Sequence, residues 1–259
     1  MKKFKESKLW FNYMKLKHEP RVFLYQYPTT FKLLANLNRK KKHILVNKDS
    51  EIVIEGFPRS GNTFAHVAFE YAQGRDVNIA SHFHAPGQII WGVKSNVPTL
   101  LLIREPVDAV SSLLIRENYL SEMQVLRWYI EFYQSVYPYM NRLVLADFNE
   151  VISDFGQVMI KINKHYSTSF IPFEHSEENV QTCFRIIEDL DRQDTKQENV
   201  TEKTVSRPSK IRNRLKIDVK KRLQTNYSQI LHEAQKIYQL YLDDLQPIYG
   251  QPNLGSLES

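Results

Sequence analysis

The sequence predicts an α/β protein with a parallel β-sheet flanked by helices, and three observations support this prediction. Short apolar runs rich in β-branched residues alternate with segments that carry apolar residues at helical spacing. The segment 99–105 contains an unbroken apolar run, LLLI, as expected for a strand buried on both faces of a parallel sheet. The 259 residues suffice for one large domain, which we place at 51–259 behind a basic, partly helical N-terminal extension at 1–50.

Each expected element follows from its local residue pattern. The N-terminal extension is expected to break near Pro20 and Pro28, because proline disrupts a helix interior. β-rich apolar runs predict strands at 51–57, 76–80, 99–105 and 142–148. Helical spacing of apolar residues predicts helices at 62–74, 107–117, 122–140, 151–166, 174–192 and about 217–247. Strands that alternate with helices favour parallel pairing.

Composition and the lengths of the apolar runs argue against a membrane-spanning protein. The chain is 42% hydrophobic and 25% charged, and no apolar run approaches the roughly 18–20 residues that a spanning helix needs. Lysines interrupt residues 1–17 too often for the apolar segment of a signal peptide. The single cysteine, Cys183, cannot form an internal disulfide, and its apolar flanks indicate a core thiol. We therefore expect a cytoplasmic protein without a transmembrane segment.

The net charge of +6 is unevenly distributed along the chain. Residues 1–50 hold 13 Lys/Arg and 3 Asp/Glu, whereas residues 51–259 hold 22 and 26. A second basic cluster lies at 207–222. Basic surface of this kind attracts polyanions such as nucleic acid, anionic lipid or nucleotide phosphates, and it is equally compatible with a solvated charged face.

The segment 56–63, GFPRSGNT, has the glycine spacing of a nucleotide-phosphate loop. It follows an expected strand and precedes an expected helix, so that backbone N–H groups and the helix end would converge on an anion. One residue departs from the nucleoside-triphosphate pattern, because Asn62 stands where a lysine grips the β- and γ-phosphates. Arg59, at the crown of the turn, supplies a positive charge instead. The segment predicts a P-loop-type sheet with an unusual phosphate ligand.

The sequence FPRSGNTF (57–64) resembles the 5′-phosphosulfate loop of cytosolic-type sulfotransferases, which use 3′-phosphoadenylyl sulfate (PAPS) as sulfuryl donor. The resemblance implies that Arg59 takes the place of the catalytic lysine of that family. It implies that Phe64 takes the place of the aromatic residue that stacks on adenine. The residues that would wrap the 5′-phosphosulfate are Ser60, Gly61, Asn62 and Thr63.

A second segment strengthens the resemblance. REPVDAVSS (104–112) is similar to the 3′-phosphate segment of the same family, and it also lies at an expected strand-to-helix junction. Arg104 and Ser112 match the residues that hold the 3′-phosphate, and a guanidinium gives a forked, permanently charged grip on phosphate. Taken alone, Arg104 fits better as a strand-end arginine paired with a carboxylate. The two motifs together, in the right order on adjacent βα units, favour the phosphate interpretation.

The third segment, SHFHAP (81–86), contains the candidate general base. His84 matches the catalytic histidine of the family, and His82 falls where the family usually has a lysine. Histidine suits proton transfer because its unperturbed pKa lies near neutral pH. Two alternatives stay open: a metal site made by His82 and His84, for which no third ligand is evident, and a hydrogen-bonded loop histidine without catalytic function.

The C-terminal part matches the family more loosely. RLVLADFNEVISD (142–154) resembles a strand and turn of the family. The family's Arg-Lys-Gly loop is not present as such, and SRPSKIR (206–212) occupies its place. Arg207, Lys210 and Arg212 are then candidate phosphate contacts. The resemblance covers about residues 50–215, so the N-terminal extension lies outside it.

The resemblance implies a PAPS-dependent sulfotransferase that requires no metal and releases adenosine 3′,5′-bisphosphate (PAP). An oxygen or nitrogen of a small-molecule acceptor would attack sulfur in line, Arg59 would stabilise the leaving phosphate, and His84 would accept the acceptor's proton. The sequence identifies neither the acceptor, which a carbohydrate would also fit, nor the oligomeric state. The aromatic residues of 127–140 fit a pocket lining, and at helical spacing they fit core positions better.

Two other functions stay open. A P-loop kinase would use Asp147, which ends an apolar run, as a magnesium ligand, but it would lack the loop lysine. A non-catalytic nucleotide- or polyanion-binding module would use residues 1–50 as its contact surface, but it would leave both phosphate motifs unexplained. Nucleic acid is not an expected partner of the enzyme.

Overall fold

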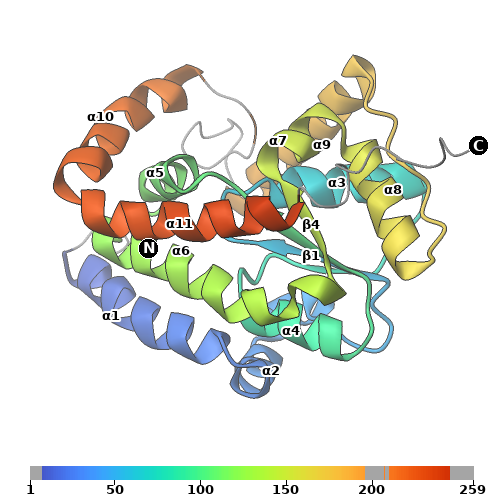
Figure 1. Cartoon of the computed structure of the whole chain (residues 1–259), viewed down its shortest axis with the longest axis horizontal. Helices are drawn as coiled ribbons and strands as arrows, with labels where there is room; N and C mark the ends of the chain where they lie inside the picture. Colours follow the sequence, from blue (N-terminus) through green and yellow to red (C-terminus); the bar gives the residue numbers. More distant parts are fainter. Residues whose placement is uncertain (1–7, 196–206, 208–209, 246–259) are drawn as a thin grey trace, which may run out of the picture.

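The computed structural model describes residues 8–195, 207 and 210–245. In these residues four parallel strands form a sheet flanked by helices, which confirms the α/β prediction (Figure 1). The strands lie in the order β2-β1-β3-β4. Their bounds are β1 Ile52–Gly56, β2 Ile79–Ser81, β3 Thr99–Ile103 and β4 Val144–Asp147.

The strand order creates a switch point between β1 and β3. The chain passes from β1 to β2 on one side of β1 and then returns to β3 on its other side. Gly56 pairs with Leu102 near the carboxyl ends of the two strands. In open parallel sheets, ligands bind in the crevice outside the carboxyl ends at such a point. Both predicted phosphate segments start there, since one follows β1 and the other follows β3.

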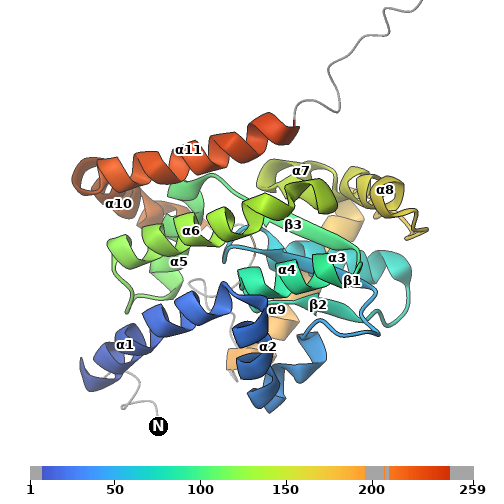
Figure 2. The same cartoon turned by 60° about the horizontal axis from the view of Figure 1, so that its bottom comes forward.

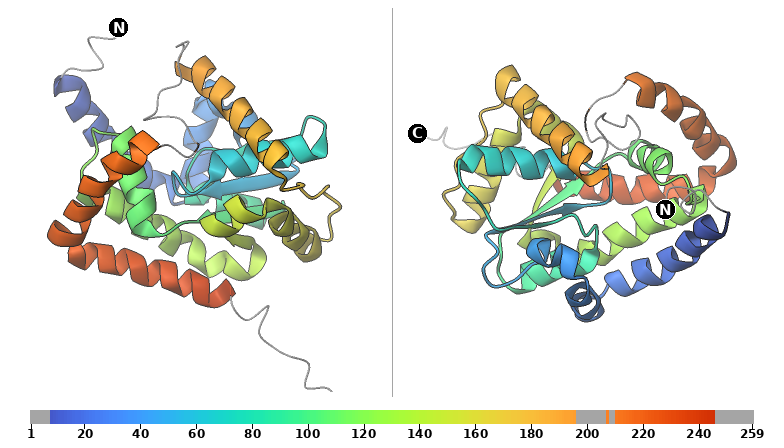
Figure 3. Two further views of the ribbon diagram at one scale, coloured as in Figure 1. Left: turned by 90° about the horizontal axis from the view of Figure 1, so that it is seen from above. Right: turned by 180° about the vertical axis from the view of Figure 1, so that it is seen from behind.

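Helices cover both faces of the sheet (Figures 2 and 3). One face carries α3 Asn62–Gln73, α7 Phe148–Ser153, α8 Phe155–Tyr166 and α9 Glu177–Thr195. The other carries α4 Pro86–Lys94, α5 Pro106–Arg116, α6 Glu122–Val136, α10 Lys210–Asn226 and α11 Ser228–Leu245. No helix within the described ranges combines the length and apolarity needed to cross a membrane.

The apolar run of β3 is explained by its burial on both faces. Leu100 and Leu102 pack in the core cluster with α3, α8 and α9, whereas Leu101 and Ile103 pack with α5 and α6. All four side chains are fully buried. A strand between two helical layers needs apolar residues at every position rather than at alternate ones.

The N-terminal extension packs beside α4 and α6. Its elements are α1 Lys8–Tyr25, α2 Pro28–Leu37 and the 3₁₀ helix η1 Arg39–Ile44. The chain does break at Pro28, which starts α2, but the break expected near Pro20 is wrong, because α1 continues through it. Val22 is buried in the core cluster of α6, and the His18 ring lies 4.8 Å from the Trp128 ring. This packing holds α1 together despite the hydrogen bond that Pro20 removes.

Other predicted elements differ at their ends. The helix expected at 151–166 is two helices, because the carboxylate of Asp154 caps α8 by accepting a bond from Gln157 N. The helix expected from about 217 is also two, α10 and α11, with Tyr227 between them. The helix expected to end at 140 ends earlier as α6 and is followed by the 3₁₀ helix η2 Tyr137–Arg142.

The helix α4 was not predicted from the sequence. Its sequence, PGQIIWGVK, contains two glycines, which lower the propensity for helix, and it is short. Tertiary packing stabilises it, since Ile89 and Val93 are buried in the same core cluster as α6. Local pattern alone therefore misses an element that packing decides.

Candidate functional site

The loop between β1 and α3 joins the end of a strand to the start of a helix, and a glycine stands near each end of it. A Cβ atom at Gly56 would lie 2.3 Å from Leu102 O, so only glycine lets β1 approach β3 this closely. Gly61 takes φ 95° and starts α3 without a side-chain cap. The first N–H groups of a helix have no intrahelical partner, and they carry partial positive charge. At α3 these groups follow directly on the loop.

Two of the predicted loop residues have a different role from the one expected. Asn62 is buried, and its Nδ2 donates a 3.0 Å bond to Phe57 O, so that it closes the loop from inside. Ser60 is fully buried beside the Tyr133 hydroxyl. The side chains expected to wrap a phosphosulfate are therefore turned into the protein at these two positions. The backbone N–H of Ser60 is also used inside the loop, since it donates a 3.2 Å bond to Phe57 O.

The two predicted phosphate segments meet in space. Arg59 Nε donates a 3.1 Å bond to Ser112 Oγ, and the Arg104 guanidinium donates a 3.0 Å bond to Arg59 O. The Arg104 guanidinium also lies 3.7 Å from the centre of the Phe148 ring. Tyr129 holds the backbone of Arg104 by donating to its carbonyl at 2.8 Å. Residues far apart in the sequence thus build one cationic site at the switch point.

Further cations surround Arg59. Burial and the neighbouring guanidiniums of Arg116, Arg212 and Arg104 lower the pKa of Arg59 to about 9, although Asp191 acts in the opposite direction. Burial, with Arg104 next, lowers the pKa of Lys216 to about 8. Like charges gathered in a low-dielectric site repel one another, and a bound anion relieves that cost. We call Arg59, Arg104, Arg116, Arg212 and Lys216 the cationic cluster.

Only part of the C-terminal basic segment that was predicted to contact phosphate lies at the site. Arg212 is buried and belongs to the cationic cluster. Arg207 instead pairs with Glu188 of α9. The side chain of Lys210 lies outside the described residues. The sequence interpretation missed Lys216, and its spacing of four residues from Arg212 on one helical face was the signal that could have found it.

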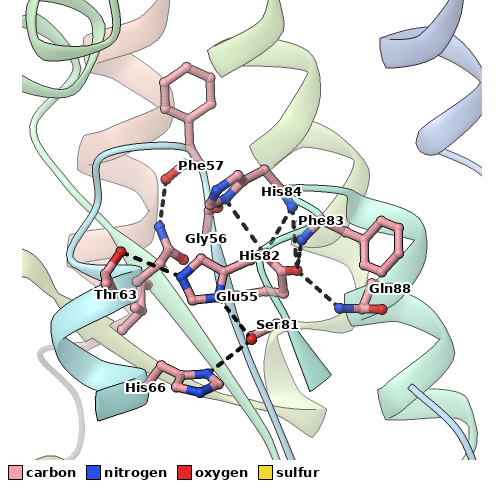
Figure 4. Close-up of polar contacts among 12 residues, drawn as sticks. Glu55, Gly56, Phe57, Thr63, His66, Ser81, His82, Phe83, His84 and Gln88 are labelled. Atoms are coloured by element: carbon pink, nitrogen blue, oxygen red, sulfur yellow. Dashed lines mark hydrogen bonds and ion pairs between the residues drawn. The ribbon is translucent and has the colours of Figure 1, made fainter. Parts of the chain in front are cut away.

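His84 lies at the edge of the loop with one nitrogen fixed. Its Nδ1 lies 2.9 Å from Gly56 O (Figure 4). Because a carbonyl oxygen only accepts, Nδ1 carries the hydrogen and Nε2 keeps its lone pair. Burial lowers the pKa of His84 to about 3, so the ring is neutral at pH 7. Its side chain is still 25% exposed.

Glu55 positions the histidine segment, and the sequence interpretation missed it. Its fully buried carboxylate accepts bonds from Phe83 N at 2.7 Å, Gln88 Nε2 at 3.0 Å and His84 N at 3.1 Å (Figure 4). Burial raises the pKa of Glu55 to about 7. The signal was a single carboxylate inside the apolar run IVIEGF, where an unpartnered charge would be costly.

Backbone strain gathers at the same place. Among the described residues, five other than glycine have positive φ, and three of these are Arg59 at 71°, His82 at 58° and His84 at 52°. Such conformations cost about 1–3 kcal/mol each and persist where the surrounding structure imposes them. The bonds from Glu55 to the segment of His82 and His84 are such a constraint.

We expect Glu55→Gln to change how stability depends on pH. A folded-state pKa raised to about 7 from 4.5 means that the folded protein holds the extra proton between these values. Its contribution to the free energy of unfolding is therefore complete below pH 4.5 and is lost as pH rises to 7, by an amount on the order of 3 kcal/mol.

The measurement is urea unfolding of wild type and Glu55→Gln from pH 4.5 to 8. The difference between them should change across that window, and the exposed control Glu233→Gln should show no such change. A pH-independent difference would show that Glu55 does not titrate there.

A narrow crevice adjoins His84. It has a volume of about 10 Å³, which is room for about one water molecule. The residues that line it are Arg21, Val22 and Tyr25 of α1, Gln26 in the turn after α1, Phe83, His84 and Pro86, and Trp128 and Phe132 of α6. The two α6 rings are therefore core residues that also line a crevice. The N-terminal extension, outside the family resemblance, supplies one wall.

Two other candidate residues lie elsewhere. Phe64 is buried, and its ring contacts those of Phe155, Phe173, Phe184 and His175, so it faces the core rather than the loop opening. An adenine could stack on it only after a rearrangement. Asp147, the magnesium ligand of the kinase alternative, caps α7 by accepting from Asn149 N at 2.8 Å.

No group of three or more His, Cys, Asp or Glu side chains in the described residues is placed to hold a metal ion. His82 and His84 do lie near each other, with ring centres 6.0 Å apart. A scan against protein-family models and a search of curated proteins gave no match to this chain.

Proposed function

We propose that this protein is a P-loop-type, PAPS-dependent sulfotransferase that acts on a small-molecule acceptor. The observation that supports the proposal most is the contact between the two sequence segments, in which Arg59 bonds to Ser112 and Arg104 bonds to the backbone of Arg59. A ligand with two separate phosphorylated groups gives a reason for both segments. The lack of a loop lysine argues against a triphosphate.

The donor would lie across the carboxyl ends of β1 and β3. The N–H groups of the loop and of the first turn of α3 would hold the 5′-phosphosulfate, and the cationic cluster would neutralise both phosphates. Negative charge builds on the oxygen that bridges sulfur and the 5′-phosphate when the S–O bond breaks. Arg59 would stabilise this charge electrostatically, as a positive charge that is already in place where the oxyanion develops.

The acceptor would enter at the crevice beside His84. Nε2 of His84 has a free lone pair and would take the acceptor's proton as the new S–O bond forms. The apolar and aromatic walls suit a planar or apolar group next to the attacking atom, and Arg21 at the rim suits an anionic substituent. The crevice is too small for such a group as it stands, so α1 would have to shift on binding.

Ligand stabilisation tests the proposal. We expect PAP at 100 times its Kd to stabilise the protein by about 2.7 kcal/mol, which raises the melting temperature by about 5 °C or more. ATP with Mg²⁺ should give a much smaller shift. The reverse order would favour the kinase alternative, and no shift with either nucleotide would overturn the proposal.

The variant Arg104→Ala should reduce the PAP shift. Bonds to charged groups contribute about 1.5–3 kcal/mol each, so the donor KM should rise by about 10- to 100-fold. The matched control is Arg127→Ala, an exposed arginine of α6. An unchanged donor KM in Arg104→Ala would remove Arg104 from the phosphate site.

A further inference from the structure

A chain of polar side chains runs from the phosphate loop towards the protein surface (Figure 4). Thr63 Oγ1 lies 3.4 Å from His82 Nε2, and His82 Nδ1 lies 2.9 Å from Ser81 Oγ. Ser81 Oγ lies 3.0 Å from His66 Nδ1. His66 Nε2 lies 4.0 Å from the carboxylate of Glu70, which is exposed, and a water molecule can bridge that distance.

Two elements hold this chain in place. Thr63, His66 and Glu70 occupy one face of α3 at spacings of three and four residues. Ser81 ends β2 and is fully buried, and His82 follows it. Thr63 stands in the first turn of α3, where the loop would hold the 5′-phosphate. The chain therefore connects the ligand side of the loop with a partly exposed histidine.

The hydrogens along the chain are coupled through Ser81. Its hydroxyl carries one hydrogen between two ring nitrogens, His66 Nδ1 and His82 Nδ1. If Ser81 donates to one ring, it accepts from the other. The two neutral rings then hold opposite tautomers, and every link has one donor and one acceptor. The hydrogen bonds along this row of side chains can therefore all donate towards the loop or all donate towards the surface.

The surroundings keep both rings neutral. Burial lowers the pKa of His66 to about 4, and it lowers the pKa of His82 well below its usual value. The positive charges that face His82 are Lys41 and Arg116, with the rings of His66 and His84 beside it. At the outer end the carboxylate of Glu70 has Asp76 as its charged neighbour. Neutral rings can pass a proton by exchanging tautomers without storing a charge.

We infer that Thr63, His82, Ser81 and His66 form a proton relay that delivers a proton from solvent to the leaving 5′-phosphate oxygen. The inference rests on the proposed function. It supplies the leaving oxygen with a hydroxyl proton donor, Thr63, which acts together with the positive charge of Arg59. The carboxylate of Glu70 at the outer end would help to reload the relay from water.

The proton transfers balance. When the bond between sulfur and the bridging oxygen breaks, its electron pair stays on that oxygen, which takes the hydrogen of Thr63 Oγ1. Thr63 takes the hydrogen of His82 Nε2, His82 Nδ1 takes that of Ser81, and Ser81 takes that of His66 Nδ1. His66 Nε2 then takes one proton from solvent. The acceptor's proton leaves separately, on His84 Nε2.

The coupling can be tested without any nucleotide. ¹⁵N NMR of the ligand-free protein should show His66 and His82 as opposite neutral tautomers at pH 7. Ser81→Ala should change the tautomer balance of at least one ring, whereas Ser50→Ala, a buried serine in the turn before β1, should change neither. Identical tautomers in wild type, or two rings that are unaffected by Ser81→Ala, would overturn the relay.

The kinetic test uses two variants. Ser81→Ala and His66→Gln should each lower kcat by about 100-fold, which is the lower end of the range for acid–base groups, with the donor KM within about twofold of wild type. His66→Gln keeps an amide that can bond to Ser81 but cannot exchange tautomers. When kcat is measured in mixtures of H2O and D2O, its dependence on the deuterium fraction should indicate that several protons move in the rate-limiting step of wild type. The same measurement should indicate fewer moving protons in both variants.

The outcomes separate the two proposals. A changed donor KM with unchanged kcat, or the same deuterium dependence in all proteins, would contradict the relay and leave the sulfotransferase proposal standing. Opposite tautomers without PAP stabilisation would keep the coupled chain and contradict the sulfotransferase proposal.

Discussion

We expect His84→Ala to lower kcat by about 10²–10⁴-fold while the Kd of PAP stays within about twofold of wild type. The reason is that a general base contributes about this factor to a proton transfer, and His84 has its Nε2 lone pair directed away from its bond to Gly56 O. PAP lacks the sulfuryl group and the acceptor, so it does not need the imidazole. Steady-state kinetics with PAPS and calorimetry with PAP measure the two quantities.

The control for His84→Ala is His165→Ala, an exposed histidine on α8. Lost PAP binding in His84→Ala would show that His84 belongs to the donor site instead. The pH profile gives a second check. Because burial lowers the pKa of His84 to about 3, the ligand-free base is deprotonated well below pH 6.5. The acid limb of kcat/KM that reports His84 should therefore lie below pH 5.

We expect Arg59→Ala to lower kcat by about 10²–10³-fold, because a preorganised donor at developing oxyanion charge is worth about that much. Arg59→Lys should recover part of the rate, since a lysine also places a positive charge there. The donor KM should change less than in Arg104→Ala. Rates of PAP release measured at a series of PAPS concentrations would give kcat and the donor KM separately. Arg127→Ala is the control.

Although Arg59→Ala should lower the rate, we do not expect it to lower the stability of the ligand-free protein. The guanidiniums of Arg116, Arg212 and Arg104 repel Arg59, and burial adds to the cost of its charge. The ligand-free Arg59→Ala protein should therefore melt at or above the wild-type temperature, and the stabilisation by PAP should shrink. The positive φ of 71° strains alanine as much as arginine, so the cost of this backbone conformation is the same in wild type and variant. A lower melting temperature without ligand would mean that Arg59 is mainly a structural residue.

The sequence predicted where Arg59 and Arg104 lie in the fold, because a local pattern carries that information. Arg59 and Arg104 follow strands whose apolar runs are unmistakable, and the parallel strand order brings the carboxyl ends of β1 and β3 together. In the structure the side chain of Asn62 closes the loop, and Phe64 lies in the core. Side-chain direction in a turn depends on neighbours that the motif does not contain.

Sequence alone determined the alternation of strands and helices, the glycine-bounded loop and the cations beside it, because these depend on residues within a few positions of one another. Only the tertiary structure decided the rest. It showed that Glu55 holds the histidine segment, that the charges of Arg212 and Lys216 of α10 lie near enough to Arg59 and Arg104 to shift the pKa values, and that α1 forms a wall of the crevice at His84. These interactions join segments far apart in the chain, and the packing of the whole core fixes them.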